Sequence, residues 1–90
     1  MNLILLSYDL RDPGRNYEPL YREIKKMGTA EHVLKSVWLL KTQLNTVEIR
    51  DTLVRFLDSN DGIIVCQLNG AAAWQNVDVD NNTVKNVLSI

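Results

Sequence analysis

Hydrophobic residues along the chain fall into short blocks that predict alternating strands and helices. Residues 2–8 are almost continuously apolar and have no helical cap ahead of them, which is typical of a central strand buried on both faces. Pro13-Gly14 then breaks the pattern with a turn. Over residues 17–27 the apolar positions recur every three or four residues, so this stretch predicts an amphipathic helix. Gly28 is suited to the left-handed position just after the helix end.

The middle of the chain predicts two further strands and a second helix. Residues 29–42 are rich in β-branched and aromatic side chains and indicate either one bent strand or, as we favour, two strands joined by a tight turn near Lys35. Asn45 and Glu48 have the spacing of a capping box. A helix is therefore expected over about residues 46–58.

A last apolar block completes the pattern and defines the expected fold. Residues 63–68 follow a turn and predict a buried strand, so the order is strand, helix, strand, strand, helix, strand. This order predicts an α+β, ferredoxin-like βαββαβ domain over residues 1–74, with an antiparallel sheet and two helices on one face. Residues 75–90 form a tail that is expected to be an extra short strand or a helical turn, covering the sheet or contacting a partner subunit. Trp74, beyond the last clear strand, is interpreted as marking an interface.

The size and composition of the chain suggest one domain that associates with itself. Ninety residues, of which 46% are hydrophobic, can form one compact domain with a modest core. The single cysteine, Cys66, excludes an internal disulfide, and its apolar strand indicates a buried core thiol. Because small domains often need extra stabilisation, we expect a homodimer.

The charge and hydrophobicity of the chain limit the partners that it can bind. Ten lysines and arginines against eleven acidic residues give a net charge of −1, which argues against wrapping nucleic acid by bulk electrostatics. Arg11 and Arg15 flank the Pro-Gly turn, where they either grip phosphates or form a solvated loop. The apolar residues 2–6 have no basic flank or cleavage site, and no apolar run approaches the roughly 20 residues of a membrane helix. We therefore expect a cytoplasmic protein without a membrane partner.

Asp9 is the candidate for chemistry because it stands where the first strand gives way to a loop. A carboxylate held there by a rigid strand suits a hard cation such as Mg²⁺, although one carboxylate is a weak site and a two-fold axis would have to supply its copy. Asp12 is the other nearby candidate. The alternative is that Asp9 only stabilises the turn before Pro13. His32, the only histidine, lies in a strand without a recognisable nucleophile motif and is expected to be structural.

Three short motifs give a resemblance to a known family. The segments LLSYDL at residues 5–10, SVW at residues 36–38 and DGIIV at residues 61–65 occur in the order and spacing of the small CRISPR adaptation nuclease family, the second of the Cas proteins. The chain looks closer still to the SinR-like and VapD-like relatives of that family, in which a segment like DPGRNY at residues 12–17 follows the strand end. The resemblance covers roughly residues 2–74.

The resemblance implies a ferredoxin-like homodimer in which the two copies of Asp9 approach each other and hold a divalent metal. Such a metal would activate water for attack on a phosphodiester. The first hypothesis is therefore a Mg²⁺-dependent endonuclease of RNA or DNA, with Asp9 as metal ligand and catalytic residue and Arg11 and Arg15 as phosphate contacts. The second is a non-catalytic dimeric adaptor that binds nucleic acid or a protein through its sheet edge and tail. Trp74, the apolar tail and the low charge favour the adaptor.

Overall fold

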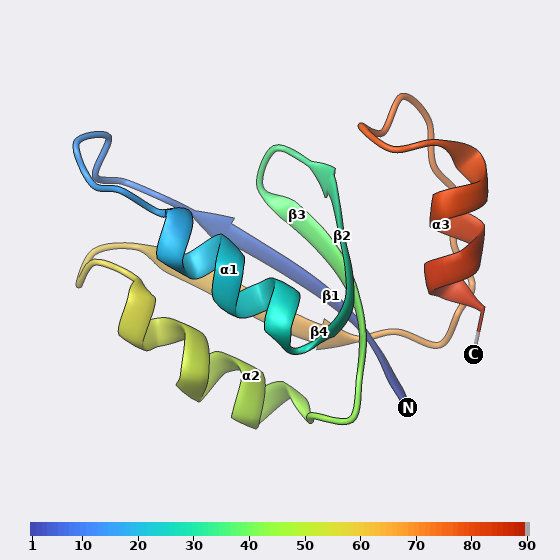
Figure 1. Cartoon of the computed structure of the whole chain (residues 1–90), viewed down its shortest axis with the longest axis horizontal. Helices are drawn as coiled ribbons and strands as arrows, with labels where there is room; N and C mark the ends of the chain where they lie inside the picture. Colours follow the sequence, from blue (N-terminus) through green and yellow to red (C-terminus); the bar gives the residue numbers. More distant parts are fainter. Residues whose placement is uncertain (90) are drawn as a thin grey trace.

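The protein is described by a computed structural model that covers residues 1–89 (Figure 1). Four antiparallel strands form one sheet in the order β2-β3-β1-β4, and the ferredoxin-like α+β fold expected from the sequence is confirmed, with one helix added at the carboxyl end. No helix within residues 1–89 is long and apolar enough to span a bilayer. The elements are β1 (Asn2–Asp9), α1 (Glu18–Lys26), β2 (Gly28–Leu34), β3 (Val37–Thr42), α2 (Thr46–Leu53) with a 3₁₀ turn η1 (Val54–Phe56), β4 (Gly62–Gln67) and α3 (Asn81–Leu88).

The start of α2 follows its sequence signal, and its end is earlier than expected. The Asn45 side chain accepts a hydrogen bond from the backbone of Glu48 at 2.9 Å, and Glu48 accepts one from the backbone of Asn45 at 3.0 Å, so the capping box is complete. The α-helix ends at Leu53 and tightens into a 3₁₀ turn that ends at Phe56. Tightening of the last turn is common where a helix passes into a loop.

Gly28 has a different role from the one expected. It opens β2 with a positive φ of 158°, which residues with a side chain rarely adopt, and the residue that terminates α1 is Met27, whose amide donates to the Ile24 carbonyl. A Cβ at position 28 would collide with the carbonyl oxygen of Lys41 on β3. Glycine is required here because two backbones approach closely, not because a helix needs a left-handed cap.

The main core lies between the sheet and the two helices α1 and α2. Both helices cover the same face of the sheet, as expected (Figure 1). Trp38 on β3 is the largest fully buried side chain of this layer, and its Nε1 donates to the Tyr8 hydroxyl at 3.0 Å. The buried members of the layer are Ile4, Leu6, Tyr8, Leu20, Ile24, Trp38, Leu40, Ile49 and Leu53.

The carboxyl-terminal segment folds back onto the opposite face of the sheet. The Asp80 side chain caps α3 by accepting from the Thr83 amide at 2.7 Å, and Val84 and Val87 are buried against β2 and β3. Lys41 Nζ donates to carbonyl groups at the end of this helix. The tail was expected to be a short strand or a helical turn; in the structure it contains a helix that covers the chain's own sheet. The part of that expectation that concerned Ile90 lies outside the described residues.

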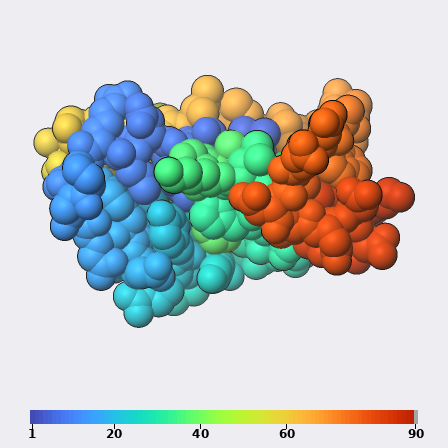
Figure 2. Space-filling view, turned by 90° about the horizontal axis from the view of Figure 1, so that it is seen from above, coloured from blue at the N-terminus to red at the C-terminus, as the bar shows by residue number. Residues whose placement is uncertain are grey.

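Trp74 takes part in this second layer. It packs with the buried residues of α3, and its Nε1 donates to the Asn81 side chain at 3.1 Å. The side chain that suggested an interface in the sequence thus lies half-buried against the chain's own sheet. Figure 2 shows the carboxyl-terminal segment at one end of the molecule and the loop after β1 at the other.

The two edges of the sheet differ. β2 has a bulge between His32 and Leu34, and the carbonyl of Val33 accepts from the Asp78 amide at 2.8 Å. β4 pairs with β1 on one side, and no other strand among residues 1–89 pairs with its outer side. Ile64 on this strand is 59% exposed. An unpaired edge with an exposed apolar side chain is a typical site for pairing with another chain.

Candidate functional site

Asp9 ends β1 in an exposed position, as the sequence predicted. Its ladder partner on β4 is Gly62, and 69% of its side chain is exposed. Its Oδ2 accepts a hydrogen bond from Arg11 Nε at 3.0 Å. The turn that follows is bonded by Asp12, whose Oδ1 accepts from the Gly14 amide at 3.2 Å. Asp12 therefore stabilises the turn, which is the role that the alternative interpretation gave to Asp9.

An open hollow of about 280 Å³ lies beside Asp9. Gly62 contributes no side chain to it, and a Cβ at that position would lie 3.4 Å from Arg11 Nη2 and 4.0 Å from the Asp9 Cβ. Ile64, the exposed residue on β4, also lines the hollow. The absence of a side chain at Gly62 thus leaves room for the Arg11 guanidinium next to the carboxylate.

Arg11 connects Asp9 to the turn before β4. Besides its bond to Asp9, the guanidinium donates from Nη1 to the Asn60 carbonyl at 2.8 Å, and the Arg11 amide donates to Asp61 Oδ1 at 2.7 Å. Its side chain is 54% exposed. A residue expected to contact phosphate thus stands directly at the candidate carboxylate, with its backbone fixed.

Arg15 is held on the far side of the same turn. Its Nη1 lies 3.7 Å from Asp58 Oδ1, and its guanidinium carbon lies 6.0 Å from the centre of the Tyr17 ring. Both contacts are at the outer limit for an ion pair and a cation–π interaction, so they hold the side chain weakly. Arg15 can leave them for a stronger partner at low cost.

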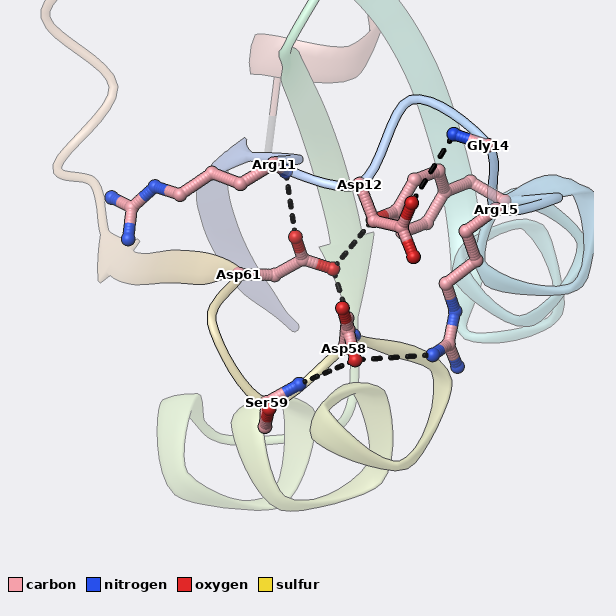
Figure 3. A network of polar contacts seen from close by, with 8 residues as sticks. Arg11, Asp12, Gly14, Arg15, Asp58, Ser59 and Asp61 are labelled. Atoms are coloured by element: carbon pink, nitrogen blue, oxygen red, sulfur yellow. Dashed lines mark hydrogen bonds and ion pairs between the residues drawn. The ribbon is translucent and has the colours of Figure 1, made fainter.

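Asp61 is the centre of this polar network, and sequence reasoning did not single it out (Figure 3). Its carboxylate accepts from the Arg11 amide, from the Tyr17 hydroxyl at 2.8 Å and from the Asp58 amide at 2.7 Å. Burial alone would raise the pKa of Asp61, but the hydrogen bonds from the Arg11 and Asp58 amides and from Tyr17 outweigh it and hold the pKa below its usual value. Burial and the bond to Asp61 raise the pKa of Tyr17. The network ties the loop after β1 to the turn before β4.

Asp9 is the carboxylate that one protomer offers a metal ion at this site. Within residues 1–89, no three His, Cys, Asp or Glu side chains lie close enough together to hold a metal ion. Asp9 nevertheless offers the oxygen donor that Mg²⁺ prefers, and its exposure leaves it open to an external ligand. The carboxylate of Asp9 is thus a ligand type that suits a hard cation, but each protomer supplies only one such carboxylate at this position.

The other residues considered for chemistry have structural contacts. His32 stacks on Trp38 with ring centroids 4.2 Å apart, and its Nε2 lies 3.0 Å from the Lys35 carbonyl and 3.4 Å from the Tyr8 hydroxyl. Burial raises the pKa of Tyr8 to about 12. Cys66, expected to be a buried core thiol, is half-buried. The prediction of a buried strand at residues 63–68 is wrong, since no residue of β4 is fully buried, because β4 is an edge strand and not an inner one.

No protein-family model matches the chain, and no solved structure is significantly similar to it. Functional inference therefore depends on the residues around Asp9 and on the motifs of the chain itself.

Proposed function

We propose that two copies of this chain form a divalent-metal-dependent endonuclease that hydrolyses a phosphodiester of RNA or DNA. The observation that supports this proposal most is the position of Asp9. Its carboxylate is exposed at the end of a central strand, beside an open hollow and next to an arginine. The proposal includes a relation to the small CRISPR adaptation nucleases and their SinR-like and VapD-like relatives, on the motifs around Asp9 and Gly62.

Each protomer would supply one Asp9 carboxylate to a shared Mg²⁺. Mg²⁺ is commonly bound by one or two carboxylates together with water and substrate phosphate, so a pair of Asp9 side chains is a sufficient protein contribution. The bound cation supplies an activated water and positive charge at the phosphate under attack. Arg11 and Arg15 would hold the phosphates on either side, because guanidinium groups bind phosphate oxygens through paired hydrogen bonds.

The second copy is supported by the surface around β4. Its outer edge is unpaired among residues 1–89, and the exposed Ile64 lies in the same hollow as Asp9. Burial of this edge between two copies would remove apolar surface from water and satisfy backbone groups. Asp9 lies on β1, one strand in from this edge, so a shared cation requires the copies to meet through the hollow that contains Asp9 and Ile64, and not through edge pairing alone.

The test is cleavage of labelled single-stranded and duplex RNA and DNA by purified protein, with Mg²⁺ or with a chelator. Asp9→Asn removes the charge and keeps the shape, and Asp51→Asn on α2 is the matched control, since Asp51 also pairs with a neighbouring arginine. We expect cleavage in Mg²⁺ by the wild type and the control, and loss of cleavage in the chelator and in Asp9→Asn. Cleavage that survives either treatment would contradict the proposal, and light scattering that shows a monomer under the assay conditions would exclude the shared site.

A second candidate is the dimeric adaptor without catalysis, which one observation favours. Asp9 is already paired with Arg11, and Arg15 already has Asp58 as a partner, so the site is close to internal charge balance. Binding of RNA or DNA without cleavage in Mg²⁺, unchanged in Asp9→Asn, would identify the adaptor.

A further inference from the structure

Arg11 occupies one of the two carboxylate oxygens that Asp9 could offer a cation. Its Nε lies 3.0 Å from Asp9 Oδ2, and both side chains are more than half exposed. An exposed ion pair of this kind is weak, so a stronger partner can replace it. A guanidinium and a divalent cation at one carboxylate repel each other, and therefore each weakens the binding of the other.

The backbone of Arg11 is fixed, while its side chain is held by two exposed hydrogen bonds. Asp61 holds the Arg11 amide at 2.7 Å, and Asp61 is itself held by Asp58 and Tyr17. In Figure 3 the Arg11 guanidinium extends away from Asp61. Apart from Asp9, the group it contacts is the Asn60 carbonyl at 2.8 Å. A change of partner thus requires rotation of one side chain and no movement of the loop.

We propose that Arg11 is a resident counter-ion of Asp9 that exchanges its partner when the site is loaded. In the free protein the guanidinium neutralises Asp9. When a divalent cation takes the carboxylate, the guanidinium turns to a phosphate group of the substrate. This inference rests on the proposed function and deepens it, because it names the residue that sets how readily the site binds a cation.

The exchange couples cation binding to phosphate binding. Without phosphate, the cation has to displace Arg11 and leave its charge unpaired. With phosphate present, the displaced guanidinium gains a bidentate anionic partner. Each ligand therefore strengthens the binding of the other by the same factor. Arg11 makes Asp9 a poor site for a cation alone and a better one in the presence of a phosphate-bearing substrate.

Binding of Mn²⁺ alone, followed by electron paramagnetic resonance of the free ion, tests the exchange without any activity. Arg11→Ala should bind Mn²⁺ about two- to five-fold more tightly than the wild type, the range that corresponds to an exposed ion pair. Arg11→Lys keeps the charge and should remain near the wild type. Lys26→Ala is the control, because Lys26 pairs with Glu23 on α1, and it should leave the affinity unchanged. Circular dichroism confirms that each variant is folded.

A non-hydrolysable phosphorothioate single strand measures the coupling between phosphate binding and cation binding. It should tighten Mn²⁺ binding to the wild type by a larger factor than to Arg11→Ala.

The outcomes separate this inference from the function on which it rests. If Asp9→Asn weakens Mn²⁺ binding while Arg11→Ala leaves it equal or weaker, Asp9 is a ligand and the exchange is wrong. If Asp9→Asn binds Mn²⁺ as the wild type does, both the exchange and the proposed metal site are wrong. Absence of Mn²⁺ binding in both the wild type and Arg11→Ala would also overturn the exchange.

Discussion

Replacement of Asp61 by alanine should destabilise the protein, because three donors lose their shared acceptor. Its carboxylate binds the amides of Arg11 and Asp58 and the hydroxyl of Tyr17, all within 2.8 Å. Hydrogen bonds to a charged group contribute about 1.5–3 kcal/mol each when buried, and here water can replace part of each bond. We therefore expect a loss of about 2–3 kcal/mol in the free energy of unfolding, large for a domain of this size.

Urea denaturation followed by circular dichroism measures this loss. With an m-value of about 1 kcal/mol per molar urea, the midpoint should fall by about 2 M. Asp51→Ala, which removes an exposed carboxylate on α2, should change the free energy of unfolding by less than about 0.5 kcal/mol. A midpoint for Asp61→Ala within the range of this control would refute the idea that Asp61 ties the two loops together.

The pH dependence of the stability difference between the wild type and Asp61→Asn provides an independent check. Because the pKa of Asp61 is lowered in the folded protein, its carboxylate stabilises the fold fully above the unfolded pKa of about 3.9. This stabilisation is lost as the pH falls through the lower, folded pKa. The difference between the wild type and Asp61→Asn should therefore be constant near neutral pH and shrink below about pH 4. A difference that stays constant in acid would show that the charge of Asp61 is not involved.

Three further predictions concern the strands and the added helix. Gly28→Ala should cost about 2–4 kcal/mol in urea denaturation, because its Cβ meets the backbone of Lys41; a neutral result would show that β2 can shift freely. Tyr8→Phe should abolish the step near pH 12 in an ultraviolet absorbance titration, and a persisting step would assign that pKa to another group. Val87→Ala should cost about 2 kcal/mol, against no measurable change for the exposed Asn82→Ala. Equal midpoints for these last two variants would mean that α3 does not stabilise the sheet.

The order of strands and helices could be predicted from the sequence because its signals are local. The capping residues Asn45 and Glu48 are three positions apart, and the turn at Lys35 separates two apolar blocks. Asp9 was placed correctly at a strand end for the same reason. Short-range patterns of this kind act before the chain has any tertiary contacts.

The parts that sequence reasoning missed depend on contacts between distant segments. Asp61 stands in an ordinary turn sequence, and its partners Arg11 and Tyr17 are 50 and 44 positions away. Gly28 follows a helix as a cap would, and only its proximity to Lys41 shows why glycine is needed. The tail had too few apolar residues to distinguish a strand from a helix, and packing against the sheet decided for α3.

The unequal edges of the sheet limit how copies of this chain can add to one another. A strand that joined β2 would have to displace Asp78 and straighten the bulge at Val33, whereas β4 can accept a neighbour without rearrangement. When two copies pair through β4, neither copy has another equally accessible edge for a third chain. Edge pairing in this protein thus favours a finite pair over a growing filament, and the same asymmetry protects a concentrated solution against fibre formation.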